Sequence, residues 1–258
     1  HLGQDAPPPS AAAAGEPYLS LEGVSAAGLN DVSLEVRAGE IVGIAGVDGN
    51  GQRELAEVVT GLRPLTKGRL KLGATTSTHL TPAQARACGV AHIPEDRLHR
   101  AIVGDMTVEE NVALGRQHLP PFARGPFIDF AGRRARAAQL LDANDVRPRD
   151  VEKRAGSLSG GNQQKLVVGR ELDAKPKLLV VVQPTRGLDI AAVNAVRAKL
   201  REQARAGCAV LLVSLDLEEV LALADRVLVM FEGRLNGAFP RAACDELELG
   251  RRMLGAQA

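Results

Sequence analysis

Aromatic side chains are nearly absent from this sequence, which has no Trp, one Tyr and five Phe among 258 residues. Because 45% of the residues are nevertheless hydrophobic, the core must be built mainly from Leu, Val, Ile and Ala. Aliphatic strands of this kind are typical of parallel sheets that helices cover on both faces. The length fits one large domain, or one domain with a sub-domain.

Charge of one sign and clustered cysteines are also lacking. The formal net charge is +1, with acidic and basic residues interleaved, so no electrostatic footprint for nucleic acid is present. Cys88, Cys208 and Cys244 lie far apart without C-x-x-C spacing. We therefore expect buried thiols of a reducing compartment and no metal site.

No aliphatic run approaches the roughly 20 residues that span a bilayer, so any membrane role must come through a partner. Residues 1–17 contain Pro7-Pro8-Pro9 and four successive alanines, and they indicate a linker or tail. They lack the basic start and long apolar middle of a secretory signal. The first residue is His1 rather than Met, which indicates a piece of a longer polypeptide.

A phosphate-binding loop is predicted where an apolar strand, 40–45, runs into a glycine-rich stretch and then a helix from Gln52. A working loop of this type reads G-x-x-x-x-G-K-[ST]. Gln52 replaces the lysine and Arg53 replaces the hydroxyl residue; alone, the stretch would also fit an unrelated glycine-rich turn. The candidate residues are Gly46, Asp48, Gly49, Asn50, Gly51, Gln52 and Arg53.

A second anion-binding helix start is predicted at Leu158-Ser-Gly-Gly-Asn-Gln-Gln-Lys165. Ser159 offers a hydroxyl, Gly160 and Gly161 allow close backbone approach, and the first-turn N–H groups lack helical partners. The bland alternative is an ordinary Ser-capped helix. An apolar strand, Leu178–Val182, follows and ends in Gln183-Pro-Thr-Arg-Gly-Leu-Asp189.

Together these segments resemble the ABC-type ATPase family from about Leu19 onward. LSGGNQQK resembles its signature motif, and QPTRGLD resembles the end of its Walker B strand and its D-loop. The resemblance implies an α/β fold: a P-loop NTPase core with a mainly parallel sheet, an antiparallel β subdomain and an inserted α-helical subdomain. It places the ABC domain at 18–258 and the helical subdomain at about 96–170.

The remaining pattern alternates strands with helices, as a mainly parallel sheet requires. A capping box, Thr107 to Glu110, opens one helix of the insert. Arg133, Arg134 and Arg136 are expected on an exposed helix face. Further strands are expected at 19–24, 32–36, 68–78, 90–94, 209–214 and 226–231, a hairpin at 233–239, and helices at 82–88, 130–142 and 246–254.

The resemblance also implies that catalytic groups are missing. The family's Walker B aspartate and the following glutamate fall at Val182 and Gln183, its switch histidine at Leu215 and its Q-loop glutamine at Glu95. Val182 has no metal ligand, and Gln183 can hydrogen-bond water but cannot act as a base. No aromatic platform for adenine is present around Ala26 and Ala27.

Family members form head-to-tail pairs, which implies unequal roles here. The signature residues Ser159, Gly160, Gly161 and Asn162, with Asp189 of the D-loop, would complete a partner's ATP site in trans. The chain's own degenerate site would hold ATP, ADP or no nucleotide, with magnesium only at the partner's site. The isolated chain is therefore expected to hydrolyse ATP negligibly.

This asymmetry resembles importers of simple sugars or nucleosides, in which two ATP-binding domains are fused. That likeness implies an upstream ATP-binding domain, transmembrane permease subunits, an indirectly coupled substrate-binding protein, and a cytoplasmic position on the inner face of the membrane. Two alternatives stay open: a stand-alone nucleotide-binding regulatory module without turnover, and an ABC protein acting on nucleic acid or ribosomes. The short insert without heptads and the absence of basic excess disfavour the last.

Overall fold

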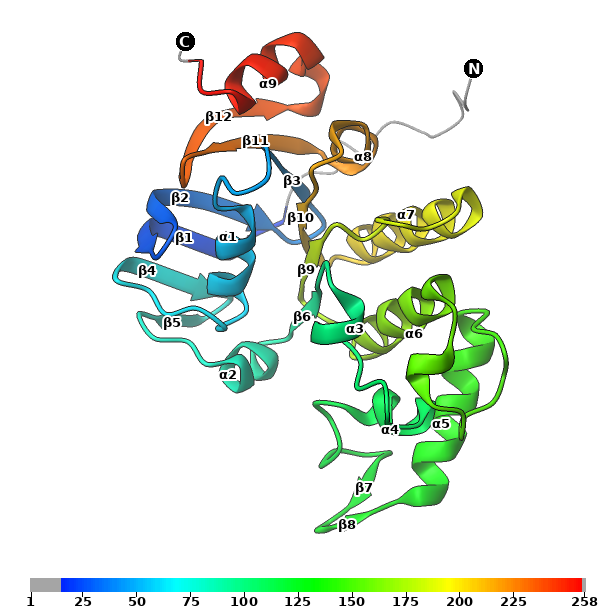
Figure 1. Cartoon of the computed structure of the whole chain (residues 1–258). Coiled ribbons are helices and arrows are strands. Elements are labelled where there is room, and N and C mark those ends of the chain that lie inside the picture. The colour runs from blue at the N-terminus through cyan, green and yellow to red at the C-terminus, as the bar shows by residue number, and fades with distance from the viewer. Residues whose placement is uncertain (1–14, 257–258) are drawn as a thin grey trace. The chain divides into compact units, whose positions relative to one another are not determined.

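The computed structural model describes residues 15–256, which form two compact units (Figure 1). The first unit contains the chain up to His92, Lys177–Gln183 and the chain from Arg197 onward. The second contains Ile93–Pro176 and Pro184–Val196. Of the linker predicted at 1–17, residues 1–14 lie outside the described residues.

The larger sheet of the first unit has six strands among the described residues, in the order β12-β11-β3-β10-β9-β6. Strands β11, β3, β10 and β9 run parallel, and β12 is antiparallel to β11. Every residue of β3, β9 and β10 is buried, as expected for aliphatic strands covered on both faces. The strands are β3 (Ile41–Ala45), β6 (Val90–Ile93), β9 (Leu178–Val182), β10 (Ala209–Val213), β11 (Arg226–Phe231) and β12 (Arg234–Pro240).

The smaller sheet is antiparallel, with the order β2-β1-β4-β5 in the described chain. It consists of β1 (Pro17–Ala26), β2 (Leu29–Arg37), β4 (Lys67–Leu72) and β5 (Thr75–Ser77). The single strand expected at 68–78 is wrong, because a turn at Gly73, with φ +54°, divides it in two. The main core cluster joins buried side chains of both sheets with those of α1 (Gln52–Val59).

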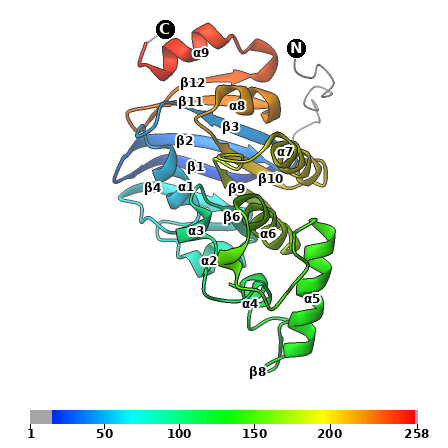
Figure 2. The ribbon, with the colours of Figure 1, turned by 45° about the vertical axis from the view of Figure 1, so that its right-hand side comes forward.

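Short helices cover the first unit (Figure 2). Helix α8 (Leu217–Leu223) packs against β3, and α9 (Glu246–Met253) packs against β11 and β12. Gly43 allows the close approach of α8, because a Cβ atom there would lie 2.6 Å from Val220 Cγ1. The remaining elements of this unit are α2 (Pro82–Ala87) and the 3-10 turn η2 (Arg241–Ala243), and α7 (Ile190–Arg205) has its C-terminal part here.

The second unit is mainly helical, which confirms the inserted helical subdomain of the predicted fold. Thr107 and Glu110 form the predicted capping box, in which Thr107 N–H donates to Glu110 Oε2 at 2.8 Å and Glu110 N–H to Thr107 Oγ1 at 3.2 Å. The elements are α3 (Arg97–Arg100), α4 (Val108–Ala113), the hairpin β7 (Ala123–Arg124) and β8 (Phe127–Ile128), α5 (Phe130–Ala143), η1 (Ala155–Ser157) and α6 (Gly160–Asp173).

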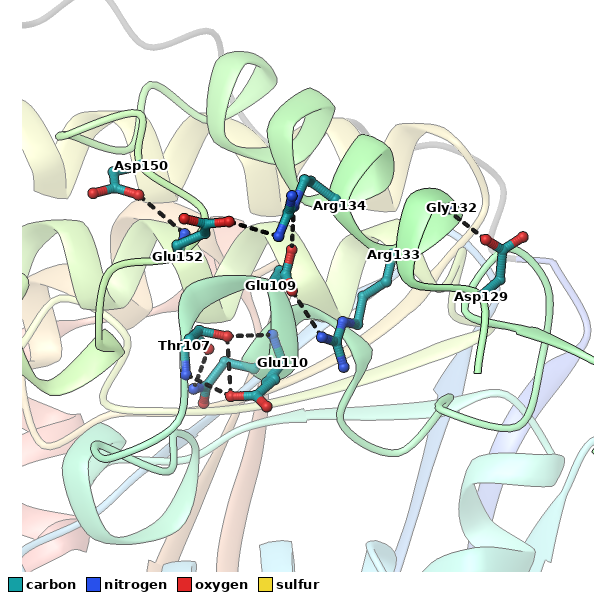
Figure 3. A network of polar contacts seen from close by, with 10 residues as sticks. Thr107, Glu109, Glu110, Asp129, Gly132, Arg133, Arg134, Asp150 and Glu152 are labelled. Atoms are coloured by element: carbon teal, nitrogen blue, oxygen red, sulfur yellow. Dashed lines mark hydrogen bonds and ion pairs between the residues drawn. The ribbon is translucent and has the colours of Figure 1, made fainter. Parts of the chain in front are cut away.

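The exposed face that the sequence suggested for the arginines of α5 is present only in part, because Arg134 is exposed whereas Arg133 and Arg136 are half-buried. Figure 3 shows Arg133 and Arg134 converging on Glu109 of α4, at 2.7 and 3.2 Å. Arg134 also contacts Glu152 at 2.6 Å, and Arg136 pairs with Asp173. Glu109 is 5% exposed, and a buried carboxylate is strongly destabilising unless it is paired. Packing of α5 against α4 therefore brings Arg133 and Arg134 to Glu109, whereas Arg136 contacts the end of α6.

The expectation of buried thiols holds for one of the three cysteines. Only Cys208 is buried, and burial raises the pKa of its thiol to about 12; Cys88 and Cys244 are half-buried. No helix in the described part of the chain is long and apolar enough to cross a bilayer.

Candidate phosphate-binding sites

The glycine-rich loop 46–51 leaves β3 and enters α1 in the first unit. Gly49 and Gly51 have φ values of +83° and +106°, which only glycine adopts readily. Gly51 is the N-cap residue of α1, and no side chain caps the helix there. The N–H groups at this helix start are therefore not capped by a side chain, and such a start is suited to bind an anion.

Gln52 does not extend from this loop as a lysine would to reach phosphate. Its side chain folds back, and Nε2 donates to the Val47 carbonyl oxygen at 3.0 Å. A Cβ atom on Gly46 would lie 2.3 Å from that nitrogen, and Gln52 is 4% exposed. A neutral amide thus occupies the loop in place of a cation.

Arg53 does not supply the missing charge to the loop. Its Nε lies 3.1 Å from Glu57 Oε1, one turn along α1, and its side chain is 59% exposed. Glu57 also accepts a hydrogen bond from Arg63 at 2.8 Å. Burial alone would raise the pKa of Glu57, but hydrogen bonds from Arg63 and Arg53 outweigh it and lower the pKa. The charge of Arg53 is consequently balanced along the helix.

Asn50 has an anchoring role that sequence reasoning missed. Its Oδ1 accepts from Glu232 N–H at 2.8 Å, while its carbonyl oxygen accepts from Gly233 N–H at 2.9 Å. Its Nδ2 also donates to the Val47 carbonyl oxygen at 3.0 Å. These bonds tie the loop to the turn between β11 and β12, whereas Asp48 is exposed. The sequence indicated a turn at Gly233, but not that this turn contacts Asn50.

Strand register brings Val182, Gln183 and Leu215 to the same sheet edge as the loop. Val213 of β10 pairs with Ile44 of β3 on one side and with Val182 of β9 on the other. Val182 is 6% exposed, and Leu215 follows β10 and is half-buried. This edge therefore presents Val182, Gln183 and Leu215 near the strand ends, without a carboxylate or imidazole among them.

Gln183 adopts a backbone conformation that is unusual for its residue type. Its φ is +50°, in the left-handed region, and its N–H donates to the Val213 carbonyl oxygen at 2.8 Å. A non-glycine residue in this region costs about 1–2 kcal/mol. The cost is tolerated because Gln183 makes the sharp turn from β9 into Pro184.

The tip of α6 in the second unit is open at Ser159 and Gly161. Ser159 is the exposed N-cap residue, but its Oγ accepts from Asn162 Nδ2 at 2.9 Å and caps no backbone N–H group. A Cβ atom on Gly161 would meet nothing within 4 Å. Asn162 Oδ1 accepts from Arg147 N–H at 2.7 Å, which fixes its orientation. The first turn of α6 can therefore meet an anion.

The segment after β9 is held to α6 within the second unit. Gln164, 3% exposed, donates from Nε2 to the Pro184 carbonyl oxygen at 2.9 Å. Glu95 forms an ion pair with Arg186, and Asp189 Oδ1 accepts from Ala192 N–H at 2.8 Å at the start of α7. Sequence reasoning did not single out Gln164 or Arg186. In the structure Gln164 is buried, and a buried amide requires a hydrogen-bond partner.

The chain matches the family model described as "ABC transporter" over residues 29–186. It is 43% identical over 252 residues to the guanosine import ATP-binding protein NupO of Bacillus subtilis, covering 95% of this chain and 49% of that protein. The chain belongs to the ABC transporter family. Below, the loop 46–53 is called the Walker A loop and Leu158–Lys165 the signature, after the family motifs that they resemble.

Other members give the same family assignment. The nucleoside import ATP-binding protein NupA of Lactococcus lactis is 42% identical over 224 residues, covering 87% of this chain and 44% of that protein. The ribose import ATP-binding protein RbsA 1 of Streptomyces avermitilis is 42% identical over 225 residues, covering 86% of this chain and 42% of that protein. The chain thus spans about half the length of these relatives.

The ABC cassette fold is also found in solved structures. A dimeric post-hydrolysis state of the ATP-binding cassette MJ0796, bound to ADP and Pi, has a TM-score of 0.75 at 20% identity, covering 86% of this chain and 98% of that one. The ADP form of MJ1267 has a TM-score of 0.75 at 22% identity, covering 93% and 99%. At these identities the likeness demonstrates the fold alone, and it confirms the predicted P-loop architecture.

Proposed function

We propose that this chain is the ATP-binding half of an importer whose own Walker A site is degenerate and whose signature completes the ATP site of a second ATP-binding domain. The observation that carries the proposal is the contrast between the two motifs. The Walker A loop is filled by the neutral amide of Gln52, whereas the α6 tip at Ser159 and Gly161 is uncovered.

The Walker A side retains a backbone frame for phosphate but not the groups that drive hydrolysis. A magnesium ion does not fit here, because Arg53 is a cation and Val182 is apolar. Gln183 can orient a water molecule but cannot take its proton. Since a general base contributes about 10² to 10⁴ in rate, this site holds ATP or ADP without appreciable turnover.

The signature side contributes groups that recognise negative charge. The Ser159 hydroxyl and the first amides of α6 would bind the terminal phosphate of the partner's ATP, aided by about half a positive charge at the helix N-terminus. Asp189, in the same unit, would accompany the signature as the D-loop residue. Hydrolysis, and the magnesium it requires, belong to the partner's site.

The names of the relatives support an importer of nucleosides or simple sugars. They are named as import ATP-binding proteins for guanosine, nucleosides, glucose and ribose, and the guanosine protein is 43% identical to this chain. Because the chain spans 49% of that protein, we propose a second ATP-binding domain in the same polypeptide, joined through a linker ending near residue 17. Permease subunits on the cytoplasmic side of the membrane would be the further partners.

The test is Ser159→Arg in the assembled importer. The bulky arginine side chain blocks the approach of the partner's ATP to the first turn of α6 and removes the serine hydroxyl. ATP turnover therefore falls about 10²-fold, comparable to the loss of one oxyanion-hole donor. Ser33→Arg, which places the same side chain on exposed β2, leaves turnover unchanged.

Unchanged turnover in Ser159→Arg would show that the signature does not act in trans. The reading frame that surrounds this chain gives a second discriminating observation. A lysine-containing Walker A motif in the same polypeptide supports the fused importer. Its absence from both the polypeptide and any co-purifying subunit favours the stand-alone regulatory module.

A further inference from the structure

Arg97, the first residue of α3, lies between the signature tip and the turn that follows β9. A Cβ atom on Gly160 would lie 2.6 Å from the Arg97 Nη2 atom, so this guanidinium lies directly against the start of the helix. The Nη1 atom donates to the Arg186 carbonyl oxygen at 3.4 Å. Arg97 thus contacts two segments that are 26 residues apart and both belong to the second unit.

The electrostatic setting of Arg97 is incomplete. Its Nε atom is shielded from solvent and has no hydrogen-bond partner among the described residues. Glu95, two residues before it, pairs instead with the side chain of Arg186, and Asp96 accepts from His99. A cation beside the N-terminal end of a fourteen-residue helix is disfavoured by the macrodipole. The arrangement becomes favourable when an anion joins the same point.

We propose that Arg97 is a positioning residue for the signature motif. It braces Gly160 against the Arg186 turn, and its charge adds to that of the α6 amides, so that the tip favours the triphosphate of the partner's site. This inference rests on the proposed in-trans function. It assigns a role to a side chain outside the signature motif itself, and it explains why Arg97 has no carboxylate partner within residues 15–256 while Glu95 pairs with Arg186.

The test measures ATP hydrolysis by the assembled importer as a function of Mg-ATP concentration. Arg97→Gln removes the charge and raises KM for Mg-ATP about tenfold, the effect expected of one partly buried charge near a helix terminus. Arg97→Lys keeps the charge and restores KM to within about threefold of the wild-type value. Neither substitution changes the melting temperature. Arg149→Gln, which removes an exposed arginine paired with Asp142 in the same unit, leaves KM unchanged.

The outcomes separate this proposal from the one on which it rests. If Ser159→Arg stops turnover while Arg97→Gln leaves KM unchanged, the role of Arg97 is wrong and the in-trans function stands. If Arg97→Lys fails to restore KM, or if the loss follows a lowered melting temperature, charge at the tip is not what Arg97 supplies and the proposal is overturned. If Ser159→Arg has no effect, both proposals fail.

Discussion

Gln52 places a neutral amide in a loop whose backbone has the conformation of a phosphate-binding loop. The glycines around it produce the phosphate-loop conformation, with Gly51 at φ +106°. In that frame the Gln52 amide bonds to the Val47 carbonyl oxygen at 3.0 Å and so stabilises the loop without adding charge. The loop therefore has an internal hydrogen bond that stabilises its conformation without bound phosphate.

A residue-scale prediction follows for Gln52→Lys. An ammonium group at this position makes charge-assisted contacts with phosphate, each worth about 1.5–3 kcal/mol, so ATP binds roughly tenfold or more tightly. Titration of the chain with ATP, with and without magnesium, measures the change. Because Val182 supplies no metal ligand, the gain does not require magnesium.

Gln117→Lys is the matched control, since it adds the same charge at an exposed position of the second unit. It leaves ATP affinity unchanged. Equal affinities of Gln52→Lys and the wild type would show that the loop no longer approaches phosphate at all. That result would contradict the proposed retention of nucleotide by the degenerate site.

At the scale of one element, α1 is held by a cluster of charges around Glu57. Arg53 and Arg63 both bond to this carboxylate, and Arg63 Nη1 also donates to the Ala27 carbonyl oxygen at 3.0 Å. Glu57 is 9% exposed, so these bonds satisfy a charge that is largely removed from water. The cluster connects the helix after the loop to the turn between β1 and β2.

Glu57→Gln is expected to weaken folding in a pH-dependent way. The pKa of Glu57 in the folded chain lies below its ordinary value of 4.5, so its contribution is complete above pH 4.5 and is lost as the pH falls through the folded pKa. At pH 7 the substitution costs about 1.5–3 kcal/mol of unfolding free energy. Urea denaturation measures the difference in unfolding free energy between Glu57→Gln and the wild type, and this difference becomes smaller below pH 4.5.

Glu202→Gln on the exposed face of α7 serves as the control and shows little loss at either pH. A gap between Glu57→Gln and wild type that is independent of pH would indicate lost packing instead of lost charge pairing. Such a result would contradict the assignment of the lowered pKa to Arg63 and Arg53.

At the scale of the whole molecule, the proposed function gives the two motifs unequal roles. We expect the isolated chain to show negligible magnesium-dependent ATP hydrolysis, because the strand ends supply neither a base nor a metal ligand. Phosphate release from the purified chain is the measurement. Steady ATP hydrolysis that Gln183→Ala abolishes would contradict this expectation. Gln183→Glu alone is not expected to create ATPase activity, because the metal ligand is still missing.

Much of the architecture could be predicted because it depends on local pattern. The aliphatic runs at 41–45, 178–182 and 209–213 became the buried parallel strands, and the capping box at Thr107 formed as written. The errors arose where neighbours decide. The split at Gly73 depends on a turn, and Arg133 is half-buried because it pairs with Glu109, a carboxylate 24 residues away in the sequence.

The sequence by itself determined the family and the fold, because its motifs resemble those of known members and its apolar residues follow the periods of strands and helices. Only the tertiary structure decided the directions of the side chains: Gln52 folded into its loop, Asn50 anchored to the β11–β12 turn, and Arg97 against Gly160. The physical reason is that a side chain's direction depends on partners distant in sequence, which only the folded chain brings within bonding distance.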